Sequence, residues 1–239
     1  MILTTYLTSL PDPQNRRGTT IRPNDHNLVP LLPGAERNQV ETIVFHDQLH
    51  QSFQIVWRGK FVDFIQVDGE PSVSLNDHRF FLFRDYLEAR PYPTESVWIS
   101  DLFDVTVNRD PHEAVPWESH TLFLGKQPWR FGDKSARGKS HARLMERWYG
   151  ELDQRIVNQH ILMAGTWGGS HASVLRFLRL LCTEIESLKP GLRNCNMAAF
   201  NKVAYCDIGR DFWWSEGPPL HSVLGARDVD NMDVAFVHK

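Results

Sequence analysis

Short apolar runs recur along the first hundred residues, and their order constrains the fold more than any other feature. Four runs have the length and the β-branched content of buried strands: ILTTYL (2–7), ETIVFHD (41–47), FVDFIQVD (61–68) and SVWIS (96–100). Between the last two, HRFFLFRDYLEAR predicts a helix that Asn76 or Asp77 caps and that ends before Pro91. This alternation is typical of an α/β fold with a largely parallel sheet, which binds ligands at the carboxyl ends of its strands.

The second half of the chain contains one long amphipathic helix. Its apolar residues follow a helical period, at Val174, Phe177, Leu178, Leu181, Cys182, Ile185 and Leu188, and Pro190-Gly191 ends it. The preceding stretch, ILMAGTWGGSH, predicts an apolar segment that runs into a glycine-rich turn. Glycine there permits a positive φ or the close approach of the backbone to a ligand, and an ordinary strand-to-helix turn is the alternative. No repeat or linker divides the chain, so we expect a single domain over residues 1–239.

Composition narrows the class of protein. The chain has 239 residues, of which 41% are hydrophobic, enough for one large core. No apolar stretch reaches the length of a membrane span, and the N-terminus lacks the pattern of a signal peptide. The three cysteines, Cys182, Cys195 and Cys206, have no metal-binding spacing and indicate reduced thiols. We therefore expect a cytoplasmic protein, whose net charge of −3 gives no general attraction for polyanions.

Residues 126–147 form a locally basic segment, KQPWRFGDKSARGKSHARLMER. Its glycine, serine and charge content predicts a mobile loop that leads into a helix. Two interpretations are equally open. The segment is a solvated surface loop, or it binds an anion such as a polyanionic acceptor.

The segment ESVWISDLFDVTVNRDP places two acids, Asp101 and Asp104, three residues apart at the end of a strand. Residues three apart on a strand point to opposite faces, so the two carboxylates converge only if the strand ends between them. Converging carboxylates repel each other, and a divalent cation removes that penalty. Their hard oxygen ligands suit Mg²⁺ or Mn²⁺. In the alternative interpretation, Asp101 caps a turn and Asp104 is exposed.

Several short motifs occur in an order and spacing that match a known family. SVWISDLFDVTVNRDP is similar to an acidic D-x-x-D-V metal motif, and HILMAGTWGGS is similar to the N-A-G-x-x-G-G stretch that borders a donor sugar. NMAAFN is similar to a D-x-A-A-F-N helix start. EGPPLHSVLG is similar to a late loop, and VAFVHK to a segment with a metal-binding histidine. With these motifs, the chain resembles the nucleotide-sugar glycosyltransferases of the GT-A fold over most of its length.

The resemblance implies a fold and an activity. The fold would be a Rossmann-like GT-A domain, a mixed and mostly parallel sheet flanked by helices. The activity would be metal-dependent transfer of a sugar from a nucleoside-diphosphate sugar, above all a UDP-sugar, and the motifs are more similar to those of retaining than of inverting members. The acceptor is left open among a glycan, a protein, a small molecule and a modified nucleic-acid base. The alternatives are a nucleotidyltransferase and a non-catalytic module that binds nucleotides or glycans.

The resemblance also implies a metal centre. Asp104 would bind Mn²⁺ or Mg²⁺, Asp101 would contact the metal or the donor ribose, and His238 would be the third ligand, as a neutral imidazole. The metal would neutralise charge on the leaving nucleoside diphosphate. Arg79 would contact the diphosphate, a task that suits a guanidinium. Arg79 as a solvated helix residue and His238 as a solvent-exposed terminal residue are the alternatives.

Further residues match positions that contact the donor in the family. They are Thr4, Thr5 and Tyr6 for the nucleoside base, Ala164, Gly165, Gly168 and Gly169 for the donor sugar, His221 for the acceptor-side loop, Lys239 for the phosphates, and Asn196, with Asp101 and Asp104, among the catalytic positions. Tyr6 as a core residue, His221 as a surface residue and a disordered Lys239 are the alternatives. Two residues depart from the family pattern. Met163 replaces its asparagine and Asn196 its aspartate, and both changes favour a binding module.

Overall fold

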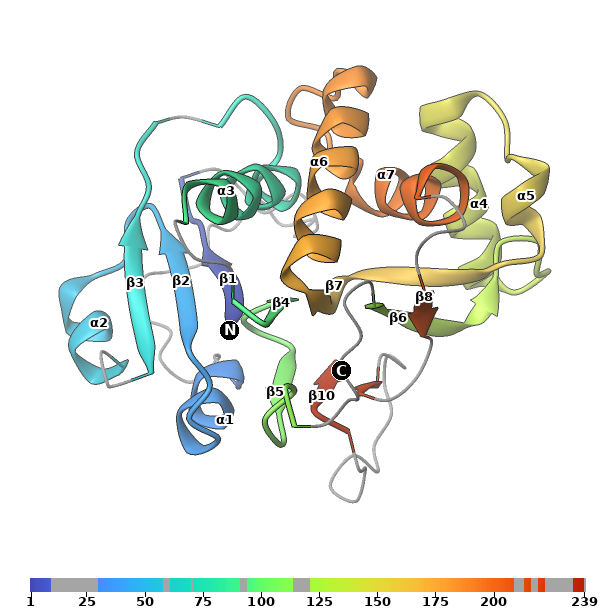
Figure 1. The fold of residues 1–239 in the computed structure, drawn as a ribbon. Helices are drawn as coiled ribbons and strands as arrows, with labels where there is room; N and C mark the ends of the chain where they lie inside the picture. The colour runs from blue at the N-terminus through green and yellow to red at the C-terminus, as the bar shows by residue number, and fades with distance from the viewer. Residues whose placement is uncertain are drawn as a thin grey trace.

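The computed structural model of the chain describes residues 1–9, 30–57, 61–69, 71–90, 94–113, 121–208, 213–215, 219–221 and 234–238. Its helices are α1 (Leu31–Arg37), α2 (Gln51–Trp57), α3 (Leu75–Ala89), α4 (Ala136–Tyr149), α5 (Gln154–Val157), α6 (His171–Leu188) and α7 (Asn196–Lys202), which a π-helical turn extends over Val203–Asp207. Its strands are β1 (Ile2–Tyr6), β2 (Thr42–His46), β3 (Val62–Gln66), β4 (Ser96–Ser100), β5 (Val105–Val107), β6 (Thr121–Arg130), β7 (His160–Ser170), β8 (Trp213–Ser215), β9 (Leu220–His221) and β10 (Phe236–His238). Figure 1 shows how these elements are arranged.

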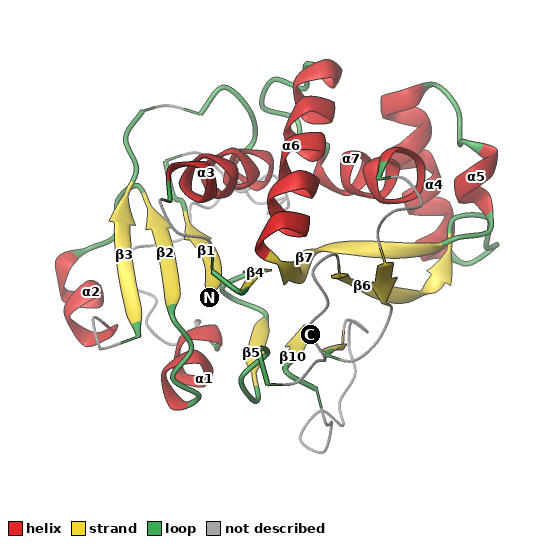
Figure 2. Ribbon diagram, in the orientation of Figure 1, coloured by secondary structure: helices red, strands yellow, loops and turns green. Residues whose placement is uncertain are grey.

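A seven-stranded sheet in the order β3-β2-β1-β4-β7-β6-β8 forms the centre of the molecule (Figure 2). The neighbours β3 and β2, β2 and β1, β1 and β4, and β6 and β8 are parallel, whereas β7 is antiparallel to both β4 and β6. The expectation of an α/β fold with a mixed, mostly parallel sheet is confirmed. The order reverses between β1 and β4, because β2 and β3 follow on one side of β1 and β4 lies on the other.

The four strands predicted in the first hundred residues are all present, as β1, β2, β3 and β4. The helix between the last two is also present as α3, but its predicted cap is wrong. Ser74 caps it, since its side chain accepts a hydrogen bond from the backbone N–H of Asp77. Asp77 is a buried residue of the first turn and binds elsewhere: its carboxylate accepts hydrogen bonds from the Ser74 hydroxyl and from the backbone N–H of Cys195. This carboxylate ties the start of α3 to the start of α7.

The predicted long helix is α6, and its apolar positions from Val174 to Ile185 are buried. The stretch before it differs from the prediction. HILMAGTWGGS does not turn at its glycines; it forms the strand β7, which is interrupted by a register shift against β6. There Leu124 pairs with Trp167 but the next residue, Gly125, pairs with Met163, so the residues between Met163 and Trp167 bulge from the ladder. Bulges of this kind redirect backbone groups beside functional sites.

The basic segment 126–147 is also more regular than predicted. Its first residues belong to β6 and most of the remainder to α4, which Ser135 caps by accepting a hydrogen bond from the backbone N–H of Gly138. Only residues 131–135 connect the two elements. The predicted helix is therefore confirmed, but the part before it is a strand and a short connection where a mobile loop was predicted.

The two faces of the large sheet pack against different elements. On one face, Leu3, Val97, Ile99 and Trp167 of the sheet join Phe83 of α3, Phe177 of α6 and Phe200 of α7 in one cluster. On the other, Ile2 and Trp98 join Leu31 of α1, Phe53 of α2 and Phe236 of β10. Alternate residues of β1 and β4 thus enter opposite layers, as the two-residue period of a strand requires.

A second sheet, in the order β5-β10-β9, lies below the large one in Figure 2. In it, β10 runs antiparallel to β5 and parallel to β9. This pairing brings the end of the described chain beside the acidic motif. Within the described ranges, no helix is both long enough and apolar enough to cross a membrane. The three cysteines are free thiols, as predicted.

Candidate metal centre

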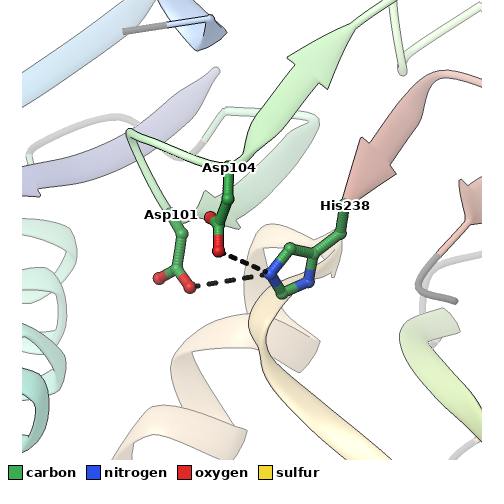
Figure 3. Close-up of side chains that lie close together, drawn as sticks. All are labelled: Asp101, Asp104 and His238. Atoms are coloured by element: carbon green, nitrogen blue, oxygen red, sulfur yellow. Dashed lines mark hydrogen bonds and ion pairs between the residues drawn. The ribbon is translucent and has the colours of Figure 1, made fainter. Parts of the chain in front are cut away.

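Asp101, Asp104 and His238 form one cluster at the carboxyl end of β4 (Figure 3). One ligand atom of each lies within 4.8 Å of the other two. The His238 Nε2 atom is 3.3 Å from Asp104 Oδ2 and 3.9 Å from Asp101 Oδ2. The two acids come from the segment that joins β4 to β5, and His238 is the last residue of β10, 134 positions after Asp104. The structure thus brings together the three residues that the sequence predicted as metal ligands.

The local chain explains why the two acids converge. Strand β4 ends at Ser100, and the backbone N–H of Asp101 donates a 2.6 Å hydrogen bond to the carbonyl oxygen of Gly165 in the bulged part of β7. The chain bends through residues 102–104 before β5 begins at Val105. The condition for convergence, a strand that ends between the two acids, is therefore met.

Strand pairing fixes the histidine. In the antiparallel pair of β10 and β5, His238 lies opposite Val105, the residue that follows Asp104. Two residues earlier, Phe236 anchors β10 against the core, with its ring centroid 5.2 Å from that of Trp98. The His238 side chain is only 3% exposed, so the alternative of a solvent-exposed terminal residue is wrong.

Gly165 lies directly behind the cluster. A β-carbon at this position would lie 2.4 Å from Asp101 Oδ2 and 2.6 Å from His238 Cε1, closer than such contacts occur in proteins. The absence of a side chain therefore allows the bulge of β7 to approach the acid and the histidine. The predicted role of glycine here, a close approach of the backbone, holds at this position, although the group it approaches is the cluster itself.

Arg79 of α3 also contacts the cluster. Its guanidinium forms an ion pair with Asp101 Oδ1 and donates a 3.3 Å hydrogen bond to the carbonyl oxygen of Ala164. The side chain is 9% exposed, so the alternative of a solvated helix residue is wrong. Arg79 takes Oδ1 of Asp101, and Oδ2 of Asp101 and Oδ2 of Asp104 lie near His238 Nε2.

The electrostatics of the cluster favour a bound cation. Burial lowers the pKa of His238, but the hydrogen bond to Asp104 and the charges of Asp101 and Asp104 raise it more, so that the net shift is upward. The acids therefore attract positive charge, which a proton supplies when a metal does not. Two carboxylates and one imidazole form a donor set that could hold a metal ion and leave coordination positions open. Side-chain exposures of 28% for Asp101 and 47% for Asp104 leave the acid side accessible to solvent.

The residues predicted to contact the nucleoside base lie at the end of β1, beside β4. Thr4 is buried, and its hydroxyl has no hydrogen-bond partner among the described residues. The Tyr6 ring is 1% exposed and packs against Phe53 and Phe103, so the alternative of a core residue is confirmed. Thr5 is half-buried on the same strand.

The other predicted residues are spread over three elements. Ala164, Gly165, Gly168 and Gly169 lie on β7, beside β4. Asn196 is the first residue of α7, and its buried side-chain oxygen has no partner in the described part of the chain. His221 is half-buried on β9, opposite Val237 of β10, and burial lowers its pKa; its partial exposure leaves the alternative of a surface residue open. Lys239 lies outside the described residues.

Asp47, which directly follows β2, was not among the predicted site residues. Its carboxylate accepts hydrogen bonds from the backbone N–H groups of Thr8 and Ser9 and from the Thr8 hydroxyl. Burial raises its pKa, but these hydrogen bonds lower it more, so it stays ionised. Asp47 thereby fixes the chain that leaves β1. The signal was present, since ETIVFHD also ends in an acid, as the strand before Asp101 does.

No protein-family model matches the chain, and no curated protein matches it.

Proposed function

We propose that this chain is a metal-dependent glycosyltransferase of the GT-A fold, which uses a nucleoside-diphosphate sugar and, by its motifs, a UDP-sugar. The observation that carries the proposal is the cluster of Asp101, Asp104 and His238. Two carboxylates and a buried imidazole converge there from sequence positions 134 residues apart. Two converging acids repel each other; Arg79 pairs with Asp101, and a metal ion held by Asp104 and His238 would offset the remaining charge.

The position of the cluster in the sheet supports a nucleotide ligand. In open α/β sheets, ligands bind beyond the carboxyl ends of the strands, at the point where the strand order reverses. Here that point lies between β1 and β4. The end of β1 carries Thr4, Thr5 and Tyr6, and the end of β4 is followed by Asp101. The residues expected at the nucleoside and the residues expected at the metal thus flank the same reversal.

The chain's own residues would hold the donor in a defined geometry. A bound Mn²⁺ or Mg²⁺ would neutralise charge on the departing diphosphate. Asp104 and His238 would hold the ion, and Asp101 would either bind it or contact the ribose. Arg79 orients Asp101 through their ion pair, and it adds a positive charge close to where the diphosphate would lie. Gly165 keeps the space behind the acids free of a side chain.

Calorimetry of UDP binding, with and without Mn²⁺, tests the proposal. The wild-type chain should bind UDP more tightly with Mn²⁺, and the doubly substituted Asp101→Asn, Asp104→Asn chain should bind it with no dependence on Mn²⁺. The matched control is Asp63→Asn with Asp85→Asn, which removes the same charge from two exposed acids. Metal-dependent UDP binding that survives in the doubly substituted site would show that the acid pair is structural.

Two further measurements identify the donor and the class. A thermal-shift panel of nucleoside diphosphates and sugar donors, with Mn²⁺, should show the largest stabilisation for the true donor, because ligands of the folded state raise its stability. Release of nucleoside diphosphate from that donor should follow. Metal-dependent binding of every donor without any release would indicate a non-catalytic binding module, and release of pyrophosphate from a nucleoside triphosphate would indicate a nucleotidyltransferase.

A further inference from the structure

Helix α4 and the bend just before it carry exposed positive charge. Five exposed basic residues are grouped here as the α4 basic face: Lys139, Arg143 and Arg147 on the outward side of the helix, Arg137 at its start, and Lys134 in the bend. Within the described ranges, none of their side chains forms an ion pair. Residues 126–147 contain seven basic and two acidic residues, in a chain whose net charge is −3. Positive charge is thus concentrated in this segment, although the net charge of the whole chain is negative.

The charges on this face are aligned. Lys139, Arg143 and Arg147 are spaced four residues apart, so they lie in one row along the helix. With a rise of 1.5 Å per residue, the row is about 12 Å long. Like charges four residues apart on a helix destabilise it. Since no carboxylate of the described chain pairs with them, a ligand outside the chain is the candidate for neutralising them.

The opposite side of α4 is already used for packing. Met145 is buried in a cluster with Phe131, Ile156 and Ile161, and Leu144 and Trp148 pack against the same cluster. The helix is therefore fixed to the body of the protein, at the end of the sheet away from β3 (Figure 1). A helix that binds a membrane surface inserts an apolar face into it. In α4 that face is covered, which argues against a lipid surface as the partner.

We propose that the α4 basic face binds the phosphate backbone of a nucleic acid. A nucleic acid offers anions in a dense regular row, with one phosphate charge per about 1.7 Å of duplex axis, so a basic row of this length meets several phosphates. Three of the five residues are arginines, whose planar guanidinium groups bind phosphate oxygens in a bidentate manner. The Arg137 guanidinium also lies 5.9 Å from the ring of Trp129, which orients it. The inference depends on α4 alone and does not require the proposed sugar transfer.

The test is fluorescence anisotropy of labelled single-stranded and duplex oligonucleotides with the full chain, over salt concentrations from about 50 to 200 mM. Binding of the wild-type chain should weaken steeply with salt. Replacement of the row by Lys139→Gln, Arg143→Gln and Arg147→Gln should lower the affinity roughly tenfold or more at the lowest salt. It should also reduce the slope of log affinity against log salt by about 2 to 3, because each lost phosphate contact contributes 0.7 to 0.9.

A matched control removes the same charge elsewhere. Arg176→Gln, Arg179→Gln and Lys189→Gln change exposed residues on and just after α6. This control should keep the wild-type slope. Circular dichroism should show that both triple variants fold, since glutamine is a good helix former.

Four outcomes would overturn the inference. They are the absence of wild-type binding to either oligonucleotide at the lowest salt, an equal loss in the control variant, an unchanged slope in the α4 variant, and preferential binding of anionic phospholipid vesicles through the α4 row. The outcome for the proposed function is separate. Metal-dependent UDP binding should be unchanged in the α4 variant, and oligonucleotide binding should be unchanged in the Asp101→Asn, Asp104→Asn chain.

Discussion

Asp77 and the pair of Asp101 and Asp104 are acids beside the same core, but their surroundings differ. Asp77 is fully buried, and its carboxylate accepts hydrogen bonds from the Ser74 hydroxyl and the Cys195 backbone N–H. Asp104, by contrast, contacts only the imidazole of His238 among the described side chains, and Asp101 has Arg79 on one oxygen alone.

This difference separates a structural acid from a ligand. A buried carboxylate that is satisfied by donors connects two elements, here α3 and the start of α7, and has no capacity left for a cation. Arg79 balances part of the charge of the acid pair, and the pair keeps oxygen atoms that face His238 and solvent, where a cation can bind. By burial alone, Asp77 would be a stronger candidate for a functional acid than Asp101 or Asp104. The hydrogen-bond donors around each carboxylate give the opposite result, because those of Asp77 already satisfy it.

The largest expected effect concerns the histidine. His238→Ala removes the only nitrogen ligand of the cluster. Even the outer partners of metal ligands account for 10–100-fold in affinity, so we expect the loss of Mn²⁺ affinity to be roughly 100-fold or more. Calorimetric titration with Mn²⁺ measures it.

His46→Ala is the control for this substitution. His46 is also a buried histidine, but it lies on β2, where its Nδ1 accepts a hydrogen bond from the backbone N–H of Leu49. The control should keep the Mn²⁺ affinity of the wild-type chain. If His238→Ala also keeps the wild-type Mn²⁺ affinity, the carboxylates alone hold the ion. The contrast between the acid pair and Asp77 would then no longer depend on the histidine.

A smaller effect is expected from the glycines of β7. In Gly165→Ala the new methyl group meets Asp101 Oδ2, the end of a side chain that can move, so the acid should be displaced and Mn²⁺ affinity should fall about tenfold. In Gly168→Ala the methyl group meets the Val97 carbonyl oxygen and the Trp98 ring, which are fixed in the core. That variant should lose about 1–3 kcal/mol of stability and keep its metal affinity.

Denaturant unfolding and Mn²⁺ titration of both glycine variants measure these two effects separately. The new methyl group also lies 2.6 Å from His238 Cε1, so wild-type metal affinity in Gly165→Ala would mean that the ion tolerates displacement of Asp101 and of His238. That outcome would contradict a role of Gly165 in positioning the two side chains for the metal.

The local parts of the fold could be predicted from the sequence, because their signals are local. The strand SVWIS was predicted with the bounds that β4 has, and the period of α6 was visible in its apolar residues. The predictions were wrong where tertiary contacts, and not the local sequence, determine the secondary structure. The glycines of β7 are typical of a turn, but the strand pairing with β4 keeps them extended. The basic segment has the composition of a loop, but the packing of Met145 and Trp148 fixes α4.

The site was predictable only in part, for the same reason. The convergence of Asp101 and Asp104 follows from a strand end, which is a local feature. The placement of His238 depends on the pairing of β10 with β5, and no local pattern specifies that pairing; only the resemblance to a family pointed to His238 as a ligand. The ion pair of Arg79 with Asp101 likewise needed the distance between α3 and β4, which the sequence does not give.

The smallest expected effect concerns Asp77 and pH. Burial raises the pKa of Asp77 more than its hydrogen bonds from Ser74 and Cys195 lower it. An acid with a raised folded-state pKa contributes stability below its unfolded pKa, about 3.9, and loses that contribution as the pH rises through the folded value. Asp77→Asn keeps a hydrogen-bond acceptor but cannot ionise. We therefore expect a change in unfolding free energy of about 1 kcal/mol or less, and in a definite direction: the variant should gain stability relative to the wild-type chain as the pH rises from about 4 to 7.

Urea unfolding of the two proteins across this pH range, without metal, measures the difference. A relative loss of stability for Asp77→Asn at higher pH would mean that the ionised carboxylate is the form the fold prefers. Asp77 would then resemble Asp47, whose hydrogen bonds do outweigh its burial. In either case Mn²⁺ affinity should be that of the wild-type chain, since Asp77 belongs to the tie between α3 and α7 and not to the metal centre.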